Sequence, residues 1–199
     1  GFRIFLISYV TTFIGTLPRL FIINDGSSKE LGLFSPVIMI LTMVVLIPNT
    51  LNQYLYPKFS YAYGENSDRT LFWKKILYVY VLSLMISLVV SIIIYLSIDY
   101  IIQIFPDYTE AAPYIKLACL PALFVGYNLG NVLCIVFKEW KWLWIYTILY
   151  GILQLITLYL ISFFVQDVLE TVIFSLLITY MVMFFYSIYI TFKITHKVN

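Results

Sequence analysis

The sequence predicts an all-α membrane protein in which six transmembrane helices form a single unit over residues 1–199. Composition is the first observation behind this prediction. The chain is 62% hydrophobic and only 11% charged, whereas a soluble domain is about half apolar and a quarter charged, and its mean hydropathy is +0.95. The second observation is that the apolar residues gather in six runs, each about as long as a helix that crosses a bilayer. None of the runs alternates as the strands of a membrane barrel do.

The six runs lie at about residues 2–23, 33–56, 76–97, 113–137, 142–165 and 170–192. Basic residues are concentrated at the two ends of the chain and in the second and fourth connections: Arg3, Lys58, Arg69, Lys74, Lys75, Lys138, Lys141, Lys193 and Lys197. Only Lys29 falls in another connection. The positive-inside rule therefore predicts that both ends of the chain are cytoplasmic. The aromatic residues expected at the two interfaces agree: Trp140, Trp142 and Trp144 inside, and Tyr95, Tyr100, Tyr108 and Tyr114 outside.

The first run, 2–23, contains a stripe of polar residues. Ser8, Thr12, Thr16 and Arg19 are spaced four, four and three residues apart, which places them within about 80° of one helix face. Arg19 lies about 6 Å from the outer end of the run. Two interpretations of this cation are open: it reaches out to the lipid headgroups, or it faces a cavity together with its stripe.

The second run, 33–56, carries Ser35, Thr42, Asn49 and Gln53 on one face, at spacings of seven, seven and four residues. Pro48 is expected to kink this helix and to free a carbonyl beside the stripe. The amides of Asn49 and Gln53 are costly in hydrocarbon, so they favour either a water-lined cavity or bonding to another helix.

The third run, 76–97, has a serine at every fourth position, namely Ser83, Ser87 and Ser91. Small polar residues at this spacing are typical of closely packed membrane helices. The fifth run, 142–165, aligns Thr147 with Gly151 and, three residues later, Gln154, and we expect packing there also. The sixth run, 170–192, follows a connection without a basic residue.

The fourth run, 113–137, aligns Lys116 with Asn131, together with Tyr127 and Cys134. Its helix is expected to be interrupted at Pro121 and loosened at Gly126 and Gly130. Lys116 lies near the outer end of the run, and the two interpretations given for Arg19 apply to it as well.

Several kinds of site have little to build on in this sequence. The apolar runs hold no cluster of His, Cys, Asp or Glu, so we expect no metal site, no cofactor and no intramembrane acid–base centre. Cys119 and Cys134 would be about 22 Å apart on one helix, far beyond disulfide reach, and are expected to be small buried side chains. The one histidine, His196, lies in the polar tail. The net charge of +2 does not suggest a nucleic-acid partner.

The polar residues of the runs together predict a substrate cavity. Guanidinium is always charged and matches phosphate or carboxylate oxygens in pairs. A cavity with cations, amides and hydroxyls, and without a carboxylate inside a span, suits an anionic and hydroxyl-rich substrate. The candidate cavity residues are Arg19, Thr16, Thr12, Asn49, Gln53, Lys116 and Asn131.

Five short stretches of the sequence resemble motifs of a known transporter family. They are Leu17–Ile22 (LPRLFI) followed by Leu31–Ser35 (LGLFS), then Ile47–Ser60 (IPNTLNQYLYPKFS) with Tyr63–Glu65 (YGE), and Phe105–Ala112 (FPDYTEAA). In this order the set resembles the second half of the bacterial lipid-linked oligosaccharide flippases, the Wzx-type exporters of O-antigen and capsule. Each motif is degenerate, and it is the ordered set that carries the resemblance over nearly the whole chain.

The resemblance implies a two-lobed transporter with six helices in each lobe, of which this chain is the C-terminal lobe. It further implies a bacterial inner-membrane protein that flips an undecaprenyl-diphosphate-linked oligosaccharide by alternating access. Because residue 1 is Gly, we expect an N-terminal six-helix lobe to precede the chain and to be its partner, with other polysaccharide-assembly proteins as further partners. Arg19, within the first motif, would meet the pyrophosphate or acidic sugars, whereas Lys116 lies in no matching motif.

Three alternatives to the flippase stay open. A multidrug extruder lobe usually needs buried acidic residues, which the spans lack, although these could lie in the other half. A polysaccharide-assembly enzyme would need acid–base groups at the membrane edge, where Asp107 and Glu110 are the candidates, although acidic residues are ordinary at the start of a helix. A purely structural scaffold fits the polar stripes and the prolines less well than a transporter that moves.

Overall fold

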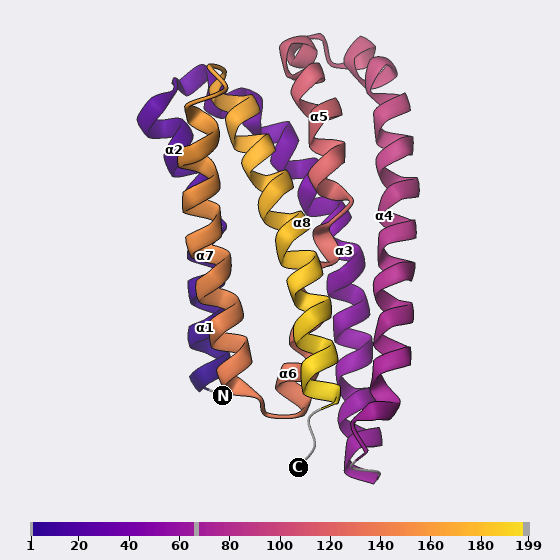
Figure 1. Cartoon of the computed structure of the whole chain (residues 1–199). Coiled ribbons are helices and arrows are strands. Elements are labelled where there is room, and N and C mark those ends of the chain that lie inside the picture. The colour runs from indigo at the N-terminus through magenta and orange to yellow at the C-terminus, as the bar shows by residue number, and fades with distance from the viewer. Residues whose placement is uncertain (1, 66–67, 197–199) are drawn as a thin grey trace.

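The computed structural model describes residues 2–65 and 68–196. All regular elements in that part of the chain are helical, and they pack as a bundle (Figure 1). Six helices are long and apolar enough to cross a membrane, over Phe2–Asp25, Ser28–Glu65, Thr70–Ile104, Pro106–Val136, Trp140–Ser162 and Val168–Thr195. The predicted all-α class is therefore confirmed, and so is the prediction of six helices long and apolar enough to span a membrane.

The first span is not one uninterrupted helix, as the apolar run 2–23 predicted. It consists of α1 (Phe2–Ile14) and α2 (Leu17–Asp25), separated at Gly15 and Thr16. The cause is Pro18, which has no N–H to donate to the carbonyl of Ile14 and whose ring crowds that carbonyl. The backbone turns through a tighter bond instead, from the Thr16 N–H to the Phe13 carbonyl at 2.9 Å.

The helices of the second and third spans, α3 and α4, are longer than the apolar runs that predicted them. α3 (Ser28–Glu65) has 38 residues and α4 (Thr70–Ile104) has 35, against predicted spans of 33–56 and 76–97. The additional turns carry polar and charged residues, so a hydropathy pattern cannot detect them. Pro36, Pro48 and Pro57 all lie inside α3 without ending it.

The fourth span is broken into short segments, as Pro121, Gly126 and Gly130 predicted. A 3₁₀ turn η1 (Pro106–Ala111) leads into α5 (Ala112–Ala122), which is followed by the 3₁₀ turn η2 (Val125–Asn128) and α6 (Asn131–Val136). The break exposes backbone groups within the bundle, and other helices bind them. The Gly130 N–H, for example, donates to Ser187 Oγ at 3.3 Å.

The last two helices pack against each other along a polar seam. α7 (Trp140–Ser162) and α8 (Val168–Thr195) are joined by a bond from Gln154 Nε2 to Ser175 Oγ at 3.1 Å and by one between the hydroxyls of Thr157 and Thr179 at 2.9 Å. All four side chains are buried. The Asp167 carboxylate caps α8 by accepting the Leu169 and Glu170 N–H groups at 2.8 and 3.0 Å.

The packing interpretation of the serine stripe is confirmed. Ser83, Ser87 and Ser91 on α4 are between 0% and 4% exposed, and a Cβ on Gly126 would come within 2.9 Å of Ser83 Oγ. Gly151 on α7 serves the same purpose, because Ile14 of α1 lies 3.0 Å from the position of its absent Cβ. Cys119 and Cys134 are free thiols and are buried, as predicted.

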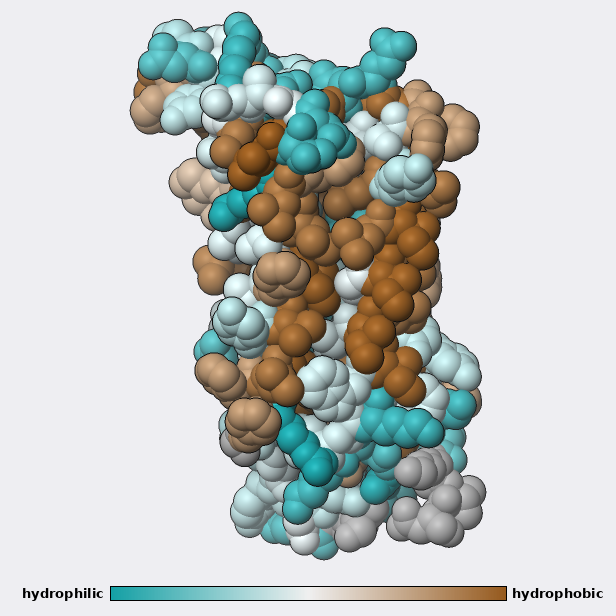
Figure 2. Space-filling model, turned by 90° about the vertical axis from the view of Figure 1, so that its left-hand side faces the viewer, coloured by the Kyte–Doolittle hydropathy of each residue, from teal (hydrophilic) through white to brown (hydrophobic). Residues whose placement is uncertain are grey.

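Both termini of the bundle lie at one end of it. The start of α1, the end of α8, the α3–α4 connection and the α6–α7 connection are all at the lower end in Figure 1. This end also holds most of the basic residues named above. Between the two polar ends, the face seen in Figure 2 shows a broad belt of apolar side chains, as expected for a protein surrounded by lipid.

Candidate functional site

A groove lined largely by polar residues lies where the broken fourth span meets α1, α3 and α7. We call it the polar groove, and its volume is about 450 Å³. The polar side chains that line it are Ser8, Thr11, Thr12, Asn49, Asn128, Asn131 and Thr147, together with Tyr127, Tyr146 and Tyr150. None of the described residues that line it is charged. Four of the six spans therefore contribute hydroxyl or amide groups to a single depression.

The interruption of the fourth span places two of its asparagines, Asn128 and Asn131, in this groove. A continuous helix would bond its own backbone throughout, but the segment from η2 to α6 turns where α3 approaches it. Asn128 Nδ2 donates to Asn49 Oδ1 of α3 at 3.4 Å. Asn128 Oδ1 is buried and accepts no hydrogen bond from the described residues. A buried acceptor without a donor is costly unless water or a ligand supplies one, so this oxygen is a group that a substrate could satisfy.

Stacked tyrosines form one wall of the polar groove. The ring of Tyr127 stacks on those of Tyr150 and Tyr180, with centroids 5.5 and 4.8 Å apart. The Tyr146 hydroxyl donates to the Tyr127 carbonyl at 2.7 Å, which satisfies a backbone group freed by the 3₁₀ turn. Rigid aromatic faces next to amides and hydroxyls provide both apolar contact and hydrogen bonds.

The helix α1 also lines the polar groove, with the hydroxyls of Ser8, Thr11 and Thr12. Thr12 Oγ1 donates to the Ser8 carbonyl at 2.9 Å, and Thr11 Oγ1 donates to the Ile7 carbonyl at 2.8 Å. Each hydroxyl retains lone pairs that can accept a further bond. Ser8 and Thr12 both line the polar groove and are exposed, although they lie within an apolar span.

The structure brings together some of the predicted cavity residues and separates others. Thr12, Asn49 and Asn131 line the polar groove. Thr16 lies at the break of the first span, where its hydroxyl donates to the Phe13 carbonyl at 2.6 Å. Gln53, one turn beyond Asn49 on α3, is exposed and lies outside the groove.

The two cations within the spans have different surroundings. Arg19 is exposed on α2, outside the polar groove, and forms no ion pair within residues 2–65 and 68–196. Lys116 lies on α5 and contacts residues of α4. Its Nζ lies 2.8 and 3.0 Å from the two carboxylate oxygens of Asp99 and 5.6 Å from the centroid of the Tyr95 ring. Lys116 thus has a partner on α4 that the sequence did not suggest.

Several residues of the groove were missed from the sequence. Asn128 is three residues before Asn131, a spacing that would have placed both on one helical face. Tyr146 directly precedes Thr147, and Tyr150 directly precedes Gly151, the two residues that the sequence aligned on one face. Aromatic residues are so frequent in this chain that their spacing alone carried no signal.

An ion pair between two connections lies at the lower end of the bundle. Arg69 Nη1 donates to Glu139 Oε1 at 2.8 Å, and both side chains are only 14% exposed. The guanidinium also lies 5.0 Å from the ring centroid of Phe137 and 5.8 Å from that of Tyr63. Burial lowers the pKa of Arg69, but the bonds to Glu139 and Tyr63 outweigh it, so the pKa is raised and the group is always charged. This contact ties the α3–α4 connection to the α6–α7 connection.

The acidic pair considered for catalysis lies at the upper end. Asp107 and Glu110 belong to η1, and the Glu110 carboxylate pairs with Lys29 at 2.5 Å. Both side chains of that ion pair are more than 60% exposed: 69% for Lys29 and 62% for Glu110. Nothing encloses a reaction site around them in the described part of the chain.

Comparisons with protein-family models, with curated proteins and with solved structures give no match. The case for a particular function therefore rests on the motifs of the sequence and on the polar groove.

Proposed function

We propose that the chain is one six-helix lobe of a membrane transporter that flips a lipid-linked, anionic oligosaccharide across the bacterial inner membrane. The lobe would rock against a second six-helix lobe around a shared cavity, in alternating access. The motifs around Arg19, Asn49 and Asp107 suggest the family, and six helices long and apolar enough to cross a membrane fit one lobe of it.

The polar groove is the observation that carries this proposal. Its amides, hydroxyls and stacked tyrosines resemble the surfaces that bind sugars, which need many hydrogen bonds and an apolar wall. Placing such groups on four membrane helices is costly unless they face water or a polar ligand. The groove lacks carboxylates, so it suits a glycan better than the organic cations that a multidrug extruder carries.

Arg19 would serve the charged part of the substrate. Its guanidinium is exposed and without an ion pair within the described residues, so a phosphate or an acidic sugar would be its first anionic partner. It lies beyond the break in the first span, towards the end of the bundle opposite the Arg69–Glu139 contact. The diphosphate and the sugars would then contact different depths of the lobe.

A complementation assay tests the proposal. A strain that lacks the complete transporter is supplied with variants of it, and surface polysaccharide is measured along with the amount of protein in the membrane. Asn49→Leu removes an amide from the polar groove, and Arg19→Ala removes the cation. Each is expected to lower surface polysaccharide at least about tenfold at an unchanged protein level.

A matched control separates the groove from the helix that carries it. Thr50, next to Asn49, is exposed, and its hydroxyl donates to the Leu46 carbonyl at 2.8 Å. Thr50→Val is expected to leave polysaccharide display unchanged. Wild-type display with Asn49→Leu would contradict the role of the groove, and normal display in the strain without the transporter would contradict the proposed function itself.

A further inference from the structure

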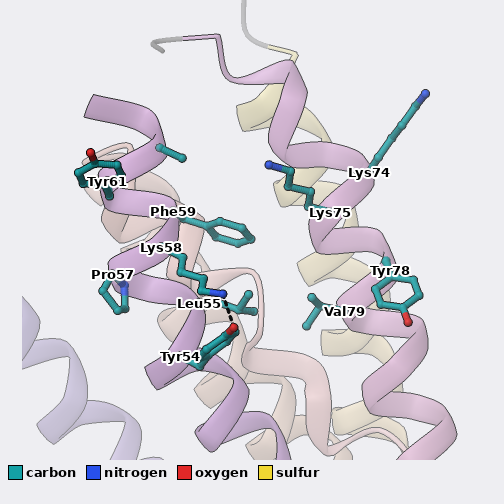
Figure 3. Close-up of a pocket in the computed structure, with 11 residues that line it drawn as sticks. Tyr54, Leu55, Pro57, Lys58, Phe59, Tyr61, Lys74, Lys75, Tyr78 and Val79 are labelled. Atoms are coloured by element: carbon teal, nitrogen blue, oxygen red, sulfur yellow. Dashed lines mark hydrogen bonds between the residues drawn. The ribbon is translucent and has the colours of Figure 1, made fainter. Parts of the chain in front are cut away.

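A second groove, on the surface of the bundle at its basic end, is lined by basic and aromatic residues. It lies between α3 and α4 near their connection and has a volume of about 910 Å³ (Figure 3). We call it the basic groove. Three lysines and three tyrosines line it, namely Lys58, Lys74, Lys75, Tyr54, Tyr61 and Tyr78, and no described residue that lines it is acidic.

Two of the lysines face each other across the basic groove. In Figure 3, Lys58 extends from α3 and Lys75 extends from α4 into the space between the helices, whereas Lys74 points away from it. The Lys58 ammonium donates to the Tyr54 hydroxyl and lies 4.1 Å from the centroid of that ring. These contacts position the Lys58 ammonium in the groove. Its remaining donor hydrogens can bind an anion.

The lysines lie at the depth of the lipid headgroups. The apolar run of α3 ends at residue 56, two residues before Lys58, and that of α4 begins at residue 76, directly after Lys75. The floor between them is apolar: Leu55, Phe59 and Val79 are buried, with 5% to 8% of each residue exposed. The basic groove therefore combines cations at the headgroup level with an apolar surface that continues into the membrane.

We propose that the basic groove binds the phosphate headgroup of an anionic phospholipid, with the acyl chains against the apolar surfaces of α3 and α4. Lysines between membrane helices, at the side richer in basic residues, attract anionic lipid electrostatically. The apolar floor favours a lipid over a free phosphate ion, which would gain nothing from it. This site is separate from the polar groove and does not depend on the substrate that the protein transports.

Lipid binding to the purified protein tests this site. The protein in detergent is titrated with fluorescent phosphatidylglycerol and, separately, with fluorescent phosphatidylcholine, which has no net charge. We expect phosphatidylglycerol to bind at least about tenfold more tightly. Each lysine near a membrane surface contributes roughly a factor of five, so the double variant Lys58→Gln, Lys75→Gln is expected to weaken phosphatidylglycerol binding about 30-fold and to leave phosphatidylcholine binding unchanged.

Lys141→Gln is the control, because it removes one positive charge at the start of α7, from an exposed residue that does not line the basic groove. It is expected to change the affinity less than about twofold. Equal binding of the two lipids by the wild-type protein, or a loss with Lys141→Gln as large as with the double variant, would overturn the proposal. Displacement of the lipid by millimolar inorganic phosphate would also overturn it, because the site would then recognise a free anion. The melting temperature of each variant shows that it is folded.

Discussion

Replacing Gly130 with alanine is expected to destabilise the protein more than any change on its surface. Gly130 lies at the turn between η2 and α6, where α4 and α8 approach the broken span. An added Cβ would come within 2.5 Å of Thr191 Oγ1, 2.6 Å of the Tyr80 hydroxyl and 2.7 Å of Ser187 Oγ. Carbon atoms do not approach oxygen that closely, so at least one of these side chains must move.

The magnitude follows from what such a movement breaks. The three side chains are between 0% and 1% exposed, so they have no free space to enter. The Tyr80 hydroxyl and Ser187 Oγ are 2.5 Å apart and hydrogen-bonded to each other. Overpacking costs about 1–3 kcal/mol, and one lost bond between membrane helices about 1 kcal/mol. A total of about 2–4 kcal/mol corresponds to a fall in melting temperature of about 5–15 °C for a chain of this size.

Thermal unfolding of the purified protein in detergent, followed by size-exclusion fluorescence, measures the effect. Gly32→Ala is the matched control, because nothing lies within 4 Å of the Cβ it would add on α3. It is expected to leave the melting temperature unchanged or to raise it slightly, since alanine favours a helix by about 1 kcal/mol over glycine. Tyr80→Phe removes one of the clashing oxygens and should recover part of the loss in the Gly130→Ala background. A wild-type melting temperature for Gly130→Ala would refute the reasoning.

Two further predictions concern ion pairs. Glu139→Gln removes the charge opposite the largely buried Arg69, so the free energy of unfolding is expected to fall by about 1–3 kcal/mol, less than for a fully buried pair; an unchanged melting temperature would contradict this. Lys116→Gln breaks the contact with Asp99, whose side chain is 66% exposed, and is expected to cost less than about 1 kcal/mol. If Lys116→Gln lowered polysaccharide display strongly while the free energy of unfolding changed this little, Lys116 would instead belong to the transport path.

The spans and their order were predictable because lipid imposes a simple rule. Every crossing needs about 20 apolar residues, and helices satisfy their own backbone. The interruption that follows Ala122, next to Pro121, and the packing of Ser83, Ser87 and Ser91 followed from similarly local causes. The break between α1 and α2 is also encoded locally, in Pro18, but hydropathy alone gives no sign of the missing N–H.

The candidate site was only partly predictable. Helical spacing identified Thr12, Asn49 and Asn131 one helix at a time, and all three line the polar groove. It also suggested Gln53, which lies outside the groove. Spacing defines a face but not which neighbour that face meets. Asn128 was missed although it is three residues before Asn131, because spacing along one helix does not show that α3 brings Asn49 within 3.4 Å of it.

The sequence by itself determined the all-helical class, the six helices apolar enough to cross a membrane and the shared end of the bundle at which α1 begins and α8 ends, because hydropathy and proline act within a few residues of where they occur. Only the tertiary structure decided that four polar stripes meet in one groove, that Lys116 pairs with Asp99 and that Arg69 reaches Glu139. Those two ion pairs join residues 17 and 70 positions apart, and the hydrogen bond between Asn128 and Asn49 in the groove joins residues 79 positions apart. Which distant side chains meet depends on how the helices pack, and the spacing of residues along a single helix contains no record of its neighbours.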